Sequence, residues 1–125
     1  MPKYTFLAFT NPAPGKEDEY NEWYEEHHLK DVINCPGFVS ARRFRLASTQ
    51  FPFNTVAPAY SYLALYEIET DDIAGSLQEV VERAGTADMV MVDAIDMTTL
   101  FAPVYEEVTP LIRAKDVQRP RRVQS

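Results

Sequence analysis

The sequence predicts an α+β fold, a two-layer sandwich in which helices cover one face of an antiparallel sheet. Strand-like and helix-like segments follow one another in the order βαββαβ, and their hydrophobic residues repeat with the period of a strand or of a helix. In addition, 46% of the 125 residues are hydrophobic, enough for one compact core. With right-handed crossovers, this order gives the ferredoxin-like arrangement, with both helices on one face.

The N-terminal third predicts a strand and a long helix. Residues 4–10 (YTFLAFT) are aromatic or apolar and are followed by the turn-forming NPAPG, so we expect a strand that ends there. Residues 16–33 have helical periodicity. The helix ends before Pro36 of NCPG, because proline cannot continue an α-helix.

Two further strands are predicted in the middle of the chain. Residues 38–46 alternate, with Phe38 and Phe44 expected on the same face. Residues 60–69 (YSYLALYEIE) are the clearest strand, and one of its faces carries three tyrosines: Tyr60, Tyr62 and Tyr66.

The last third predicts a second helix and an edge strand. Residues 71–85 form an amphipathic helix, capped at its N-terminus by Asp71 or Asp72. Residues 98–108 (TTLFAPVYEEV) form the last strand. Pro103 within this strand favours an edge position, because proline cannot donate a hydrogen bond to a neighbouring strand.

Charge is divided unevenly along the chain. The formal net charge is −7, although residues 113–125 are basic. We therefore expect one acidic domain over residues 1–112, a poor partner for nucleic acid, followed by a flexible basic tail. The single Cys35 excludes an internal disulfide. The N-terminal apolar run is too short for a signal peptide or a membrane span, so we expect a soluble, cytoplasmic protein with no membrane partner.

Both histidines of the chain lie side by side in the first predicted helix. On a wheel of about 100° per residue, His27, His28 and Asp31 lie on or beside an aromatic stripe that includes Trp23 and Tyr24. Asp31 is four residues after His27 and three after His28, spacings that bring helical side chains into contact. An imidazole oriented by a carboxylate can exchange protons near neutral pH. Equally, the pair can be a partly buried hydrogen bond that only satisfies both groups.

Other residues have both a functional and a structural interpretation. Two adjacent histidines and an aspartate lack a recognised ligand spacing, so we expect no metal. The strand tyrosines could hold a phenolic or carbonyl substrate, or simply pack. Phe51 and Phe53, on a proline-bearing loop, could form a lid or anchor the loop. Arg43 and its neighbouring arginines are expected to pair with Glu67 or Glu69.

The segment NPAPGKEDEYNEWYEEHHLKDVINCPGFVSARRFRL, residues 11–46, resembles the EthD-like family of the dimeric α/β-barrel superfamily. The positions that match the family's pattern are Asn21, Trp23, Tyr24, His28, Asp31, Pro36, Gly37, Phe38, Arg43 and Phe44. Two positions depart from it: Lys30 stands where the pattern has proline, and His27 is an additional histidine. Beyond residue 46 the resemblance is one of element order.

The resemblance implies a dimer whose two sheets form a shared barrel, with a cavity between each sheet and its helices. A homodimer also follows from the two-layer fold, because the uncovered sheet face, if apolar, needs a partner. Members of the superfamily include cofactor-free lyases, isomerases, polyketide cyclases and monooxygenases, as well as haem enzymes. The fold therefore does not fix the chemistry.

We expect a cofactor-independent lyase, isomerase or cyclase that acts by proton transfer on a small apolar, aromatic or polyketide-like molecule. His28 would be the general acid or base, Asp31 would orient it, and Tyr24 would stabilise a developing oxyanion. The remaining expected pocket residues are Trp23, His27, Phe44, Tyr60, Tyr62, Tyr66, Phe51 and Phe53. Two alternatives stay open: a cofactor-free monooxygenase, and a dimeric binding protein without turnover.

Overall fold

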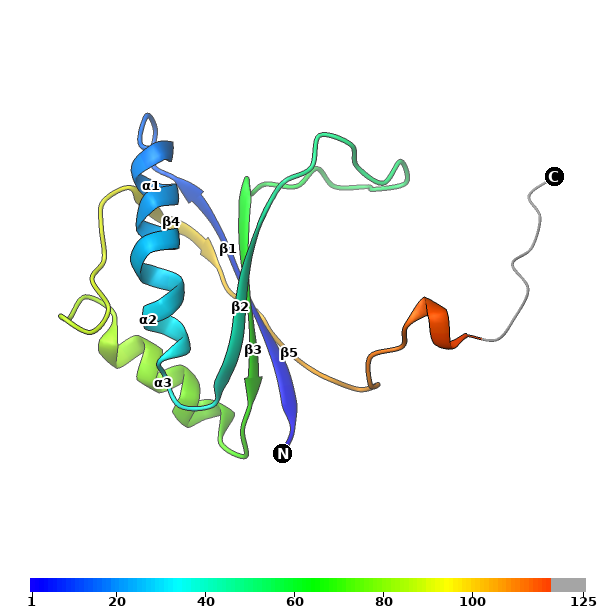
Figure 1. Cartoon of the computed structure of the whole chain (residues 1–125). Helices are drawn as coiled ribbons and strands as arrows, with labels where there is room; N and C mark the ends of the chain where they lie inside the picture. Colours follow the sequence, from blue (N-terminus) through cyan, green and yellow to red (C-terminus); the bar gives the residue numbers. More distant parts are fainter. Residues whose placement is uncertain (118–125) are drawn as a thin grey trace.

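The computed structural model describes residues 1–117, which form a sheet covered on one face by helices (Figure 1). All strand pairings are antiparallel, in the spatial order β2-β3-β1-β4, and β5 also pairs with β1. The α+β class and the ferredoxin-like strand order expected from the sequence are confirmed. The strands are β1 (Lys3–Pro12), β2 (Phe38–Arg45), β3 (Tyr62–Glu69), β4 (Ile95–Phe101) and β5 (Val104–Glu106).

The helical layer has two members. The first is continuous and consists of α1 (Glu17–Trp23), the π-helical turn η1 (Tyr24–His28) and α2 (Leu29–Ile33). The second is α3 (Ile73–Arg83), where Asp72 is the N-cap and its Oδ1 accepts a hydrogen bond from the Gly75 amide at 2.9 Å. Both lie on the same side of the sheet (Figure 1). A short 3₁₀ turn, η2 (Ala114–Asp116), follows the last strand.

The register of β2 differs from the simple alternation predicted for it. A shift between Phe38 and Ser40 puts Phe38 on the helix-covered face, opposite Ile68, whereas Phe44 faces the other way. The prediction that Phe38 and Phe44 share a face was therefore wrong. The reason is a β-bulge, which inserts one extra residue and reverses the facing of everything beyond it.

The last predicted strand is interrupted. β4 starts earlier than expected, and the chain between it and β5 contains Pro103, whose carbonyl accepts a hydrogen bond from the Leu7 amide at 2.9 Å. β4 is the outermost strand of the sheet order, so the edge position inferred from this proline is confirmed.

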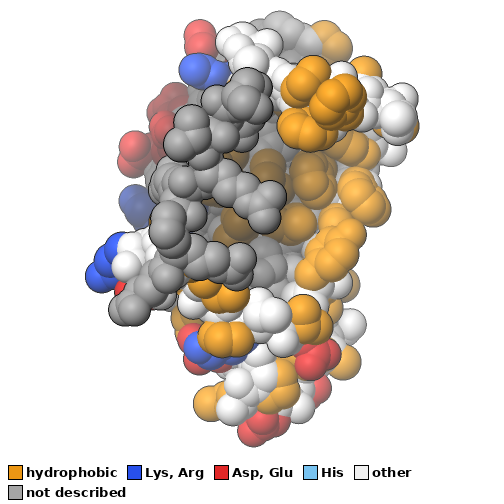
Figure 2. Space-filling view, turned by 90° about the vertical axis from the view of Figure 1, so that its right-hand side faces the viewer, with side chains coloured by type: hydrophobic (Ala, Val, Ile, Leu, Met, Phe, Trp, Pro, Cys, Tyr) orange, Lys and Arg blue, Asp and Glu red, His pale blue; other side chains and the backbone are white. Residues whose placement is uncertain are grey.

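The open face of the sheet is apolar at its centre. Leu7 pairs with Leu65, and Phe9 pairs with Leu63 and stacks on Phe101 at 5.8 Å between ring centroids. Figure 2 views the molecule from this side and shows hydrophobic side chains gathered on it. Among residues 1–117, no helix has the length and apolar character needed to cross a membrane.

Candidate functional site

A cavity of about 460 Å³ lies between the sheet and its helices. It is lined by β1, β3, the π-helical turn, α3 and the chain from Met89 to Val104. Nearly all of its lining is apolar. The polar side chains that reach it are His28, Tyr24 and Tyr66.

The π-helical turn positions His28. The Leu29 amide donates to the Tyr24 carbonyl, a bond that spans five residues instead of the four of an α-helix. Trp23 and His28 are also five residues apart, and their rings stack at 4.3 Å with 21° between planes. In an α-helix of about 100° per residue these two side chains would point in directions about 140° apart. The π turn therefore brings His28 onto Trp23 and into the cavity.

Trp23 is itself fixed in place. Its Nε1 donates to the Val90 carbonyl at 2.8 Å, and only 4% of the residue is exposed. The edge of the Tyr24 ring also packs against His28, at 5.2 Å between centroids. The imidazole is thus held between two aromatic side chains, which restrict its orientation.

His28 carries an unpartnered polar atom. Its Nδ1 is buried and has no hydrogen-bond partner among residues 1–117. Burial lowers the pKa of His28 from 6.5 to about 4. The imidazole is consequently neutral at pH 7, the form that accepts a proton.

Tyr66 carries the second unpartnered polar atom. Its hydroxyl is buried and finds no hydrogen-bond partner in the described part of the chain, and burial raises the pKa of Tyr66 well above its usual value of 10. Burial also raises the pKa of Tyr24 to about 12, whereas the Thr10 hydroxyl is hydrogen-bonded to the neighbouring Tyr20. Tyr66 is therefore a neutral phenol whose O–H is available to a ligand.

Among residues 1–117, Asp31 makes no polar contact with His28. Within residues 1–117, neither a hydrogen bond nor an ion pair links Asp31 to His27 or His28, and His27 is exposed to solvent. Burial is the main cause of the raised pKa of Cys35, and the charge of Asp31 adds to it. Helical side chains lean toward the N-terminus, and the His28 ring lies on Trp23, one turn before it and away from Asp31. The structure therefore does not form the expected His–Asp pair.

Arg43 lies against the first helix, a position that the sequence did not indicate. Its Nη2 donates to Asn21 Oδ1 at 2.8 Å, and its guanidinium lies 4.6 Å from the centroid of the Tyr24 ring. Glu25 is the carboxylate beside it, at 3.7 Å. The expected pairing with Glu67 or Glu69 was wrong, because the bulge in β2 turns Arg43 toward the helices.

The other predicted pocket residues lie outside the cavity. Tyr62 is buried beneath α1 and donates to Glu17 Oε2 at 2.6 Å. Tyr60 precedes β3 and packs against Phe9 on the open face of the sheet, so it does not share a face with Tyr62 and Tyr66 as predicted.

The aromatic residues of β2 and the following loop also lie away from the cavity. Phe44 is on the open face, with the Arg42 guanidinium 5.7 Å from its ring centroid. Phe51 and Phe53 are 66% and 81% exposed and pack against each other at 5.7 Å. Their loop extends on the side of the sheet opposite the helices (Figure 1), so neither covers the cavity.

Sequence reasoning missed the apolar wall that follows α3. Three methionines line the cavity there: Met89, Met91 and Met97. The apolar run MVMVDAIDM was the available signal, but its irregular backbone gives it no helical or strand periodicity. No group of three or more His, Cys, Asp or Glu side chains in the described part of the chain is placed to hold a metal ion.

We compared the chain with known protein families, curated sequences and solved structures, and a solved structure is similar to it. No protein-family model matches the chain, and no curated protein sequence matches it. The fold is similar to a crystal structure described as an ethyl tert-butyl ether d (EthD) family protein from Bacillus halodurans. The two are 14% identical, with 86% of this chain and 100% of that chain covered and a TM-score of 0.47. This is the family that residues 11–46 resemble.

Proposed function

We propose that this chain is a cofactor-independent enzyme that moves a proton on a small, largely apolar carbonyl compound, as a lyase, isomerase or cyclase does. The observation that carries the proposal is a pair of unpartnered, buried polar atoms, His28 Nδ1 and the Tyr66 hydroxyl, on two residues that line an otherwise apolar cavity. A buried polar atom without a partner costs free energy, and a ligand that bonds to it recovers that cost.

In this mechanism Tyr66 and His28 have complementary roles. The Tyr66 O–H donates to the substrate carbonyl oxygen, and His28 Nδ1 takes a proton from the adjacent carbon. The products of this step are an enolate and an imidazolium. Return of the proton to another carbon completes an isomerisation, expulsion of a leaving group completes an elimination, and attack on a second carbonyl closes a ring.

The lowered pKa of His28 sets which proton transfer the free imidazole can begin: it can accept a proton at pH 7, but it has none to donate as an acid. At pH 7 the free imidazole is already deprotonated, because burial disfavours its cation. The developing enolate supplies the negative charge that the cavity lacks, so proton transfer becomes less costly once the substrate is bound. The Arg43 guanidinium behind the Tyr24 ring adds a fixed positive charge near the same end of the cavity.

The test is deuterium exchange at the carbon beside a carbonyl. β-Tetralone, a bicyclic ketone, is incubated with the protein in D₂O and followed by NMR. We expect exchange above the rate in buffer, and a loss of about 10²–10⁴-fold in His28→Ala. His27→Ala, one residue away but exposed, is the matched control and retains the exchange. Equal exchange in both variants contradicts the role of His28.

A second candidate function, binding without turnover, is favoured by the same low pKa of His28. A histidine with a pKa of about 4 is a weak base, which suits a cavity that binds an apolar molecule without turning it over. In that case the ketone changes the fluorescence of Trp23, the single tryptophan, which stacks on His28, yet no deuterium enters it.

We also infer that two copies associate through the open face of the sheet. The support is its apolar centre, in which Leu7, Phe9, Leu63 and Leu65 remain only partly buried in the single chain. Burying apolar surface is the main favourable contribution to protein association, and a two-layer fold has no second layer of its own to cover this face.

A further inference from the structure

The cavity is polar at one end and apolar elsewhere. Tyr24 lines the cavity together with both polar groups: its ring packs on His28, and, after burial, Tyr24 is the next contributor to the raised pKa of Tyr66. The lining from α3 and β4 has no polar group and includes Leu77, Val80, Val81, Met97 and Leu100. A ligand that fills the cavity therefore places its polar atoms at one end.

The apolar end opens to solvent between α3 and β4. Val81 of α3 is 66% exposed, and Met97 and Leu100 of β4 are 52% and 42% exposed, although all three line the cavity. In contrast, Tyr66 is 1% exposed. Side chains that line a cavity and also face water mark its opening. Leaving these three in water costs free energy that an apolar ligand segment would remove.

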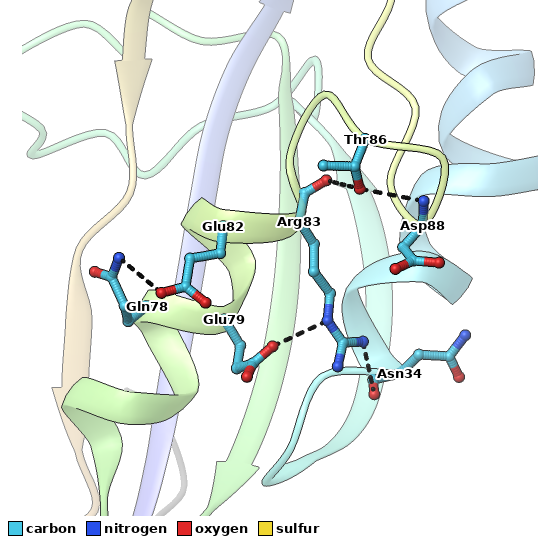
Figure 3. A network of polar contacts seen from close by, with 7 residues as sticks. All are labelled: Asn34, Gln78, Glu79, Glu82, Arg83, Thr86 and Asp88. Carbon is cyan, nitrogen blue, oxygen red and sulfur yellow. Dashed lines mark hydrogen bonds and ion pairs between the residues drawn. The ribbon is translucent and has the colours of Figure 1, made fainter.

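On the side away from β4, α3 contacts the end of the first helix. Figure 3 shows Arg83 donating from Nε to Glu79 at 3.1 Å and from Nη1 to the Asn34 carbonyl, just beyond α2, at 3.3 Å. Thr86 Oγ1 donates to the Arg83 carbonyl at 2.7 Å, which secures the end of the helix. One polar contact, from Arg83 to Asn34, thus joins α3 to the end of the first helix, whereas apolar side chains border the gap toward β4.

We propose that the ligand has one oxygen-bearing head group, held at His28 and Tyr66, and a linear apolar tail that leaves the cavity between α3 and β4. This deepens the proposed function and rests on the same cavity. A compact ligand bound at the polar end leaves Val81, Met97 and Leu100 in water, whereas a tail covers them. These three residues therefore determine the length of tail that is preferred.

The test uses straight-chain methyl ketones of increasing length, with dissociation constants measured by calorimetry. We expect Kd to fall about fourfold for each added methylene while the tail lies inside the cavity, and then to level off. Val81→Glu weakens binding of the long ketones only. Ala74→Glu is the matched control: it places the same charge on an exposed part of α3 that does not line the cavity, and it leaves the series unchanged.

Tyr66→Phe separates the head from the tail, because it weakens every ketone of the series by the same factor. A Kd that does not depend on chain length, or a loss in Val81→Glu that is equal for short and long ketones, overturns the inferred ligand class. The proposed catalysis fails separately. If Kd depends clearly on chain length but no deuterium is exchanged, the ligand class stands and the proposed catalysis is refuted. If deuterium is exchanged but Kd does not depend on chain length, the catalysis stands and the ligand class is refuted.

Discussion

His28 makes the stability of the folded chain depend on pH in a way that can be measured without a substrate. Its pKa is about 4 in the folded protein and 6.5 when unperturbed. Between these values the unfolded chain binds a proton that the folded chain does not. The contribution is therefore fully present above pH 6.5 and is lost as the pH falls toward 4.

The magnitude follows from the two pKa values. Each pH unit between them is worth about 1.4 kcal/mol, so the complete loss is about 3 kcal/mol, of which about 2.5 kcal/mol has been lost by about pH 4.5. Substitution of His28 by glutamine removes the titration and keeps a polar side chain of similar size. The free energy of unfolding of the wild-type chain should thus fall by about 2.5 kcal/mol relative to His28→Gln between neutral pH and about pH 4.5.

The assay is urea unfolding followed by far-UV circular dichroism, at one protein concentration and several pH values. Carboxylates such as Asp93 and Asp96, whose pKa values are lowered by Lys16 and Thr98 respectively, titrate alike in both proteins and cancel in the difference. His27→Ala, which changes the exposed neighbour, should follow the wild-type curve. Parallel curves for wild type and His28→Gln would refute the burial of a neutral imidazole, and with it the base proposed here.

Three further predictions concern assembly, the backbone and the C-terminal end. Light scattering should give twice the 14.3 kDa chain mass for the wild type and the single-chain mass for Leu65→Glu. Ala74→Glu should stay dimeric, and a monomeric wild type contradicts the open-face interface. Gly37→Ala should destabilise by roughly 1–3 kcal/mol, because φ is +88° and an added Cβ would lie 2.8 Å from Ser76 Oγ. Gly15→Ala, at φ +76° with no neighbour within 4 Å, should cost less; equal costs would mean that contact with Ser76 is unimportant. Deleting residues 113–125, of which 118–125 lie outside the described structure, should leave the melting temperature nearly unchanged, and a fall of many degrees would show that this end packs on the domain.

The local features of the backbone were the hardest to predict. A π turn differs from an α turn by a single hydrogen bond and one extra residue, and no residue type in Tyr24–His28 requires it. Both halves of the first helix must pack on the same sheet, with Tyr20 and Trp23 before the turn and Val32 after it buried. The bulge in β2 arises in the same way, since pairing with β3 on either side of it fixes the register.

The sequence by itself determined the element order, the approximate bounds of the strands and helices, and His28 as the histidine nearer the cavity. These depend on periodicity and on turn residues, which act over a few neighbouring positions. Only the tertiary structure decided that His28 lies on Trp23 and not beside Asp31, that Tyr66 rather than Tyr60 or Tyr62 faces the cavity, and that methionines complete its wall. The physical reason is that these relations join segments distant in sequence, and small changes of phase in the π turn and the bulge decide which side chains meet.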